Sequence, residues 1–196
     1  LEPYGAQILG LSVASTTQLT ALFAVGMLMA FAWASRSLAK GRDPIRIAGT
    51  GGVLGVFAFA TVIFSAPLES SALFRLGTVG IGLGHGLFAV GTLTYAMLLG
   101  TEGMAGLAIG AWGAVQTAAT GVAIFAGGAI RDVFHSFAET GALEPALTAP
   151  EIAYGAVYHI EIFILFIGLI ALGPLVRQPG DRVYQQSNAQ LVDFPG

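Results

Sequence analysis

The sequence predicts an all-α protein, a polytopic membrane helix bundle with about five transmembrane helices. Of its 196 residues, 55% are hydrophobic and only 10% are charged, whereas a soluble domain carries about 25% charged residues. The apolar runs are long enough for a bilayer core of about 30 Å, which takes about 20 helical residues to cross. They lack the short alternation of barrel strands, and unpaired backbone groups in lipid are costly, so helices are the expected spans.

Apolar runs between charged residues predict where the spans lie. The five spans are about Ser12–Ala34, Ile47–Phe64, Leu73–Leu99, Gly106–Phe134 and Ala153–Val176. We therefore expect residues 1–176 to form the transmembrane bundle and residues 177–196 to form a polar tail.

The segments that flank the spans carry signals of their own. The segment before the first span, "LEPYG", looks like the end of something upstream, which predicts that the sequence is a fragment. Before the last span, Thr148 offers a hydroxyl cap, Pro150 suits the first turn, and Glu151 follows the threonine by three residues. This pattern is typical of a helix start.

Basic residues predict the orientation of the bundle. Six of the eight lie in the first inter-span link or after the last span, which an odd number of spans places on one side. These six are Arg36, Lys40, Arg42, Arg46, Arg177 and Arg182. By the positive-inside rule this side is cytoplasmic, so the tail is cytoplasmic and the acidic loop from Asp132 to Ile152 is on the opposite side.

Glycines inside the spans repeat at four-residue intervals. The pairs are Gly51–Gly55, Gly80–Gly84, Gly82–Gly86 and Gly106–Gly110. This spacing lets helix backbones approach closely in lipid. Close helix packing is one interpretation, and flat surfaces left open for a planar ligand are the other.

His85 lies about halfway along the third predicted span, within the run "GLGHGLF". A neutral imidazole can give one axial nitrogen to a metal centre, and small neighbours at Gly84 and Gly86 would let a flat macrocycle approach. A chlorophyll-type magnesium or a haem iron would suit such a site. The alternative is a buried histidine that hydrogen-bonds to a carbonyl or to a neighbouring helix.

Other polar residues within the spans are candidate sites because their burial in lipid is costly. Gln18 and Gln116 are expected to link helices by hydrogen bonds, with a substrate contact as the alternative. Glu161 is either a proton-coupling carboxylate or a protonated, hydrogen-bonded residue of the bundle. Tyr158 lies on the same helix face as Glu161, as does Tyr154, whereas His159 points elsewhere, so a His–Glu pair is not expected.

Several functional classes lack their characteristic residues. The chain has no cysteine, and it contains no zinc spacing, nucleophile elbow or phosphate-binding glycine loop. We therefore expect no enzyme activity and no nucleic-acid partner. The basic segment "SRSLAKGRDPIRIAG" can contact the anionic head groups of membrane lipids or a soluble partner, although the positive-inside bias alone also explains it.

Three stretches together resemble the PucC/LhaA family of photosynthetic bacteria, within the major facilitator superfamily. They are "LEPYGAQILGLSVASTTQLTAL", "GLGHGLFAVGTLTYAM" and "GLAIGAWGAVQTAATGVAIFAGGAIRDV". The resemblance extends to about Val176. It implies that the five spans match helices eight to twelve of a twelve-helix protein, with "LEPYG" at the end of helix seven.

The resemblance also implies a function. Family members are implicated in assembling light-harvesting complexes, so we expect an assembly factor or accessory subunit in the intracytoplasmic photosynthetic membrane. The implied partners are antenna polypeptides and the reaction centre, and the implied cofactors are bacteriochlorophyll and carotenoid, with His85 as a candidate magnesium ligand. The alternative is a secondary transporter, for which this chain would supply only part of the alternating-access architecture.

Overall fold

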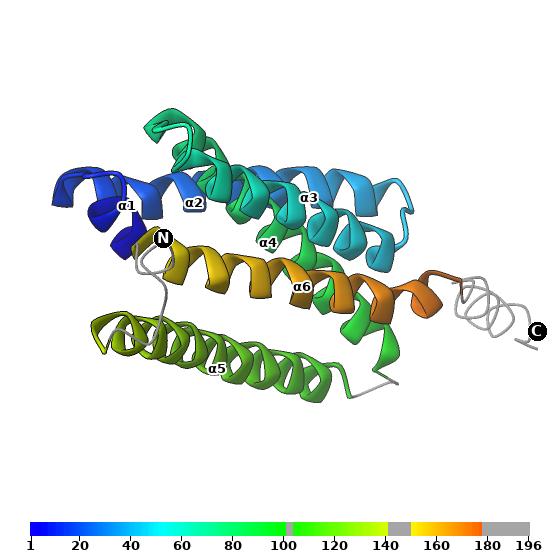
Figure 1. Cartoon of the computed structure of the whole chain (residues 1–196). Helices are drawn as coiled ribbons and strands as arrows, with labels where there is room; N and C mark the ends of the chain where they lie inside the picture. The colour runs from blue at the N-terminus through cyan, green and yellow to red at the C-terminus, as the bar shows by residue number, and fades with distance from the viewer. Residues whose placement is uncertain (101–103, 141–149, 178–196) are drawn as a thin grey trace, which may run out of the picture.

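The computed structural model describes residues 1–100, 104–140 and 150–177, and these ranges are helical apart from short connections (Figure 1). The helices are α1 (Glu2–Gln7), α2 (Val13–Ala39), α3 (Pro44–Ser65), α4 (Ser71–Leu99), α5 (Ala105–Glu139) and α6 (Pro150–Arg177). Five of them, α2 to α6, are long and apolar enough to cross a membrane. The predicted all-α bundle of about five spans is confirmed.

Most of the helices extend beyond the predicted spans at one end or at both, and polar side chains cap the starts of α2 and α3. The hydroxyl of Ser12 accepts a hydrogen bond from the Ser15 N–H at 3.3 Å at the start of α2. The Asp43 carboxylate accepts one from the Ile45 N–H at 2.8 Å before α3. Side chains of this kind satisfy amide groups that the first helical turn leaves without partners. The proposed Thr148 cap and the tail from residue 178 lie outside the described residues.

Helix α4 packs closely against both α2 and α3, and glycine backbones form the contacts. A Cβ atom on Gly84 would lie 2.7 Å from the carbonyl oxygen of Gly51 in α3, and one on Gly82 would clash with the carbonyl oxygen of Phe23 in α2. Both distances are shorter than real Cβ atoms make, so only glycine fits. Backbones that approach this closely gain van der Waals contact, which is the main attraction between helices in lipid.

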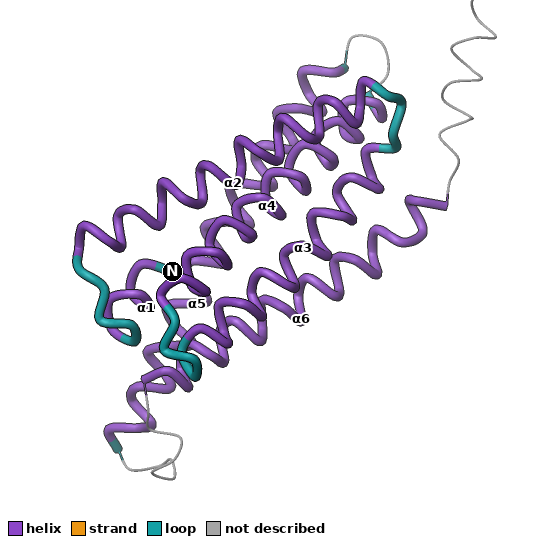
Figure 2. Tube along the Cα trace, turned by 90° about the horizontal axis from the view of Figure 1, so that it is seen from above, coloured by secondary structure: helices purple, strands orange, loops and turns teal. Residues whose placement is uncertain are grey.

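Helix α5 is attached to the bundle more loosely. Figure 1 shows α5 beside α6, on the side of α6 that faces away from α2 and α3, and Figure 2 shows α2, α4, α3 and α6 side by side. Within the candidate span of α5, Ala105–Phe134, no residue of the most apolar window is buried. Its Trp112 indole N–H donates a hydrogen bond to the Thr92 hydroxyl of α4 at 3.1 Å. Much of the α5 surface is therefore free to meet something other than this chain.

The helices alternate in direction. The connection between α2 and α3 and the end of α6 lie at the same end of the bundle (Figure 1). The basic residues Arg36, Lys40, Arg42 and Arg46 are thus at the end where Arg177 closes α6. The sequence prediction that these basic groups share one side agrees with this arrangement.

We expect Gly82→Ala to destabilise the bundle by about 1–3 kcal/mol, because the added methyl group forces the α2 and α4 backbones apart. The matched control is Gly121→Ala on α5, where nothing lies within 4 Å of an added Cβ. The control should be neutral or slightly stabilising, because alanine favours a helix over glycine by about 1 kcal/mol. Thermal unfolding in mild detergent, followed by circular dichroism, measures both. Equal stability of the two variants would contradict the close contact.

Candidate functional site

His85 projects from the side of α4 that neither α2 nor α3 covers. Its neighbours Gly82 and Gly86 face α2 while Gly84 faces α3, which leaves the imidazole exposed. Its ring centroid is 5.8 Å from that of Phe23, and among the described residues it makes no hydrogen bond. A buried, hydrogen-bonded histidine is thus not observed among the described residues. The role of axial ligand stays a prediction.

Gly84 and Gly86 do not provide the open surface that was predicted beside His85. A Cβ on Gly86 would lie 2.6 Å from the Ala30 Cβ of α2, and Gly84 is against the α3 backbone. Both glycines are buried between helices. Their geometry fits the packing interpretation and leaves no room for a pigment ring to touch them directly.

An apolar pocket lies farther along the same face of α4. Spacings of seven, four and three residues place His85, Thr92, Ala96 and Leu99 on one helix face. The pocket, of about 520 Å³, lies between the end of α4 and the start of α5 and includes Ala96, Leu99 and Trp112 in its lining. This face of α4 thus combines one free imidazole with an apolar surface.

The chemistry available on this face is narrow. In the part of the chain that the structure describes, no group of three or more histidine or acidic side chains is arranged to hold a metal ion. A single imidazole can supply one axial bond to a metal that already sits in a macrocycle, but it cannot hold a free ion by itself.

The predicted hydrogen-bonded links through Gln18 and Gln116 are not observed. Gln18 is exposed near the start of α2, and Gln116 is half-buried on α5. Among the described residues, neither side chain makes a hydrogen bond. Neither amide reaches a polar group on a neighbouring helix among the described residues, so their role in partner contacts stays a prediction.

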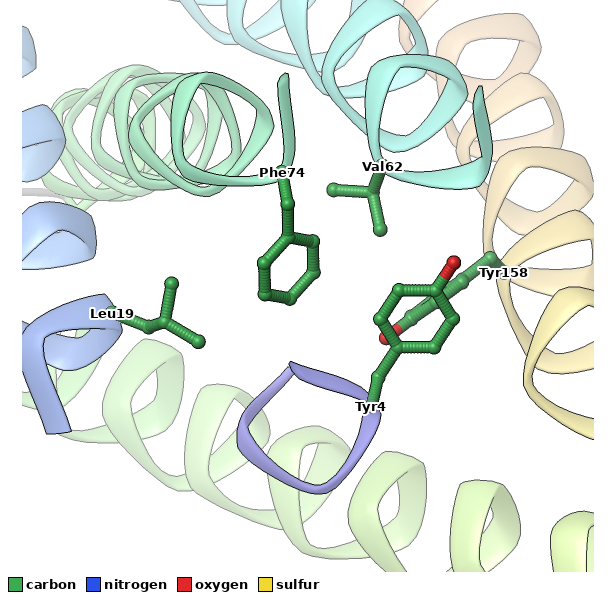
Figure 3. Packing of buried hydrophobic residues seen from close by; sticks show 5 residues of the cluster. All are labelled: Tyr4, Leu19, Val62, Phe74 and Tyr158. Atoms are coloured by element: carbon green, nitrogen blue, oxygen red, sulfur yellow. The ribbon is translucent and has the colours of Figure 1, made fainter. Parts of the chain in front are cut away.

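Aromatic side chains from three helices meet at the end of the bundle opposite the basic residues (Figure 3). Tyr4 of α1 lies between Phe74 of α4 and Tyr158 of α6, with ring centroids 5.3 and 5.4 Å away. Leu19 of α2 and Val62 of α3 complete the buried cluster. Ring pairs at this separation stabilise a core beyond the area that they bury.

The apolar run lengths did not predict the short helix α1, whereas the family resemblance implied that "LEPYG" ends a helix. Pro3 near the helix start and Glu2 in the first turn are typical N-terminal residues. The Glu2 carboxylate accepts a hydrogen bond from the Thr20 hydroxyl at 2.6 Å, and the Gln7 side-chain oxygen accepts one from the Tyr154 hydroxyl at 2.6 Å. Helix α1 thereby joins α2 to α6.

Glu161 lies one turn beyond Tyr158 on α6. Its Oε2 atom is buried and has no hydrogen-bond partner among the described residues. Tyr154 and Tyr158 share the face as predicted, but the Tyr154 hydroxyl donates to Gln7 instead of serving Glu161. His159 is exposed, and its Nδ1 contacts the Gly155 carbonyl oxygen at 2.7 Å, so no His–Glu pair forms, as expected.

Comparisons with known proteins place this chain among photosynthetic bacterial sequences. It is 48% identical, over its whole length, to the "Uncharacterized protein in puhA-bchM intergenic region" of Rhodobacter capsulatus, of which it covers 42%. It is 52% identical over 67% of its length to protein PucC of Rhodovulum sulfidophilum, of which it covers 29%. Over 90% of its length it is 42% identical to protein PucC of Cereibacter sphaeroides, of which it covers 38%.

The chain therefore spans less than half the length of these curated relatives. No solved structure matches it, so the likeness to half of a major facilitator stays a prediction. The family model described as PUCC protein matches residues 1–180, which is nearly the whole chain. This protein belongs to the PucC family.

Proposed function

We propose that this protein is a non-enzymatic assembly factor or accessory subunit of photosynthetic light-harvesting complexes. Membership of the PucC family supports this function, because the family resemblance implies antenna assembly. The structural observation that carries it is the open apolar surface of α5, a membrane helix whose most apolar window has no buried residue in this chain. The proposed partner for that surface is the transmembrane helix of an antenna polypeptide.

Glycines along α5 form a stripe that suits such a partner. At five of them an added Cβ would meet nothing within 4 Å, unlike at the glycines of α4. We call Gly106, Gly110, Gly113, Gly121 and Gly128 the α5 stripe. Their spacing places them on one side of the helix. A second helix backbone can approach a surface of this kind closely, as α2 and α3 approach α4.

The surface beside the α5 stripe is apolar and large. Leu107, Val122 and Phe125 are 66%, 67% and 77% exposed. Exposure of these apolar side chains to lipid carries no free-energy penalty, so it does not by itself drive association with another helix. They do allow a partner helix to lie along α5 without meeting an unpaired charge.

Pigment binding is the finer part of the proposal. A bacteriochlorophyll magnesium accepts an axial nitrogen ligand, and the exposed His85 imidazole without a hydrogen bond can supply it. Phe23 beside His85 and the apolar pocket between α4 and α5 would contact the rest of the pigment or a carotenoid. His85 would supply a nitrogen ligand to the pigment magnesium, and the surrounding apolar residues would exclude water.

The proposed location is the intracytoplasmic photosynthetic membrane, with the C-terminal end of α6 on the cytoplasmic side. The charge pattern supports this orientation, because the basic α2–α3 connection and Arg177 are at the same end of the bundle. The reaction centre, together with its antenna polypeptides, is the proposed neighbourhood.

A secondary transporter is the second candidate, because Glu161 has a buried carboxylate oxygen without a partner. If the whole natural protein transports a solute, proton-linked uptake into vesicles should be abolished by Glu161→Gln, since the amide cannot carry a proton. Vesicles that show no flux with the unmodified protein would rule this candidate out.

Antenna assembly should depend on the α5 stripe. We expect the whole natural protein with Gly110→Leu and Gly113→Leu to restore antenna absorbance several-fold less well in a bacterium that lacks its own copy, because the leucines hold a partner backbone away. The control pair, Ala118→Leu and Ala129→Leu, adds bulk to exposed positions off the stripe and should restore it fully. Near-infrared absorbance of isolated membranes, normalised to protein amount, provides the measurement.

Two results would count against this assignment of the α5 stripe. One is normal antenna absorbance with both pairs of substitutions. The other is that the stripe variants of the purified protein unfold at a lower temperature in detergent than the control pair. In that case the stripe packs against the rest of the longer protein, so it is not an antenna-docking surface.

Pigment binding should depend on His85. We expect His85→Ala to remove the near-infrared absorbance of the purified protein, since no other imidazole shares that face of α4. The control is His159→Ala, which removes an exposed imidazole that contacts its own helix. If His85→Ala leaves bound pigment unchanged, His85 is not the ligand and only the packing role of α4 stands.

A further inference from the structure

A second pocket lies at the connection between α2 and α3, at the opposite end of the bundle from the buried cluster around Tyr4 and Tyr158. It has a volume of about 440 Å³. Its lining consists of Trp33, Gly41, Arg42, Asp43, Arg46, Ile47 and Thr50. Trp33, Ile47 and Thr50 belong to candidate membrane spans, whereas Gly41 to Asp43 lie between them. The pocket therefore crosses the boundary between an apolar and a polar environment.

The connection itself has a defined backbone conformation. Gly41 has a φ of +74°, and its N–H donates to the Leu38 carbonyl oxygen at 2.8 Å. The Arg42 N–H donates to the Ser37 carbonyl oxygen at 3.1 Å. These two bonds form a Schellman motif, which ends α2 and turns the chain directly into the Asp43 cap of α3. Arg42 is thus held at the edge of the pocket.

Among the described residues, neither Arg42 nor Arg46 of the pocket forms an ion pair with a carboxylate. The ion pair found among the described residues joins Arg131 to Asp132, elsewhere in the chain. Arg42 instead lies over the Trp33 ring, with its guanidinium carbon 5.8 Å from the ring centroid. The one carboxylate in the lining, that of Asp43, already accepts the Ile45 N–H at 2.8 Å. The pocket therefore has a net positive charge.

Part of the pocket lining is apolar, so a small free anion would match only the arginine side of the pocket. Trp33 is 39% exposed, and Ile47, which is only 2% exposed, also contributes to the lining. Tryptophan is typical of membrane interfaces because its ring is apolar and its N–H is polar. Arginine pairs bind phosphate through parallel hydrogen bonds. A ligand that fills this pocket has a phosphate group joined to an apolar chain.

We propose that this pocket binds one anionic phospholipid, with its phosphate between Arg42 and Arg46 and its acyl chain along Trp33, Ile47 and Thr50. The bound lipid neutralises the two guanidinium groups and fills the space between the end of α2 and the start of α3. The site depends on neither pigment nor antenna binding, so it stands or falls separately from the proposed function.

The test compares two double variants of the whole natural protein that each remove two positive charges from the same segment. Arg42→Gln with Arg46→Gln changes the pocket. Arg36→Gln with Lys40→Gln is the control, because neither residue lines the pocket and Arg36 donates to the Ala32 carbonyl oxygen of its own helix. Native mass spectrometry after extraction in mild detergent counts the retained phosphatidylglycerol, and circular dichroism checks that both variants keep their helix content.

We expect the pocket variant to bind phosphatidylglycerol at least about tenfold more weakly than the control variant. Added phosphatidylglycerol should raise the unfolding temperature of the unmodified protein, whereas phosphatidylcholine and soluble glycerol phosphate should not. Equal loss of lipid from both variants would overturn the proposal, because a general surface charge would then explain binding. Stabilisation by glycerol phosphate alone, or retention of an acidic protein in place of lipid, would also overturn it.

Discussion

The close approach of α4 to α2 and α3 is the constraint on which the rest of the arrangement depends. Gly82 and Gly86 bring α4 against α2, and Gly51 and Gly84 bring it against α3. Since no side chain separates the backbones, the three helices have little freedom to rotate about their axes. Each residue of α4 therefore faces α2, faces α3 or lies on the side that neither helix covers. His85 and Thr92 fall on the side that α2 and α3 leave open.

Polar groups at the other end of the bundle are used for assembly of the chain itself. The side chains of Glu2 and Gln7 attach α1 to α2 and α6, and Tyr4 inserts between Phe74 and Tyr158. These hydrogen bonds give the polar side chains of α1 partners on two other helices. Glu161 is the exception, because one of its carboxylate oxygens is buried without a partner. That exception is why a transporter remains the second candidate.

Buried residues are distributed unevenly among the helices. This distribution bears on both the proposed docking surface on α5 and the proposed lipid pocket. Helices α3 and α4 bury glycines and small residues in contacts with their neighbours, whereas the most apolar windows of α5 and α6 have no buried residue. The exposed face of α5 is the surface to which the antenna helix of the proposed function would bind. The lipid pocket lies on the tightly packed half, at the α2–α3 connection, so occupation of one surface does not require the other.

Composition and apolar run length by themselves determined that the chain is an all-α bundle of about five spans, because crossing lipid requires long helices whose backbone bonds are internal. The positions of the basic residues also predicted that the α2–α3 connection and the end of α6 lie on the same side. Which way each polar side chain faces depends on contacts between segments far apart in the sequence. Gln18 and Gln116 therefore could not be recognised as unbonded from their position in a span. The glycine spacing was the same for pairs that pack, such as Gly82–Gly86, and for Gly106–Gly110, which does not. Only the tertiary structure decided between them, because packing depends on whether a second backbone is present to fill the space.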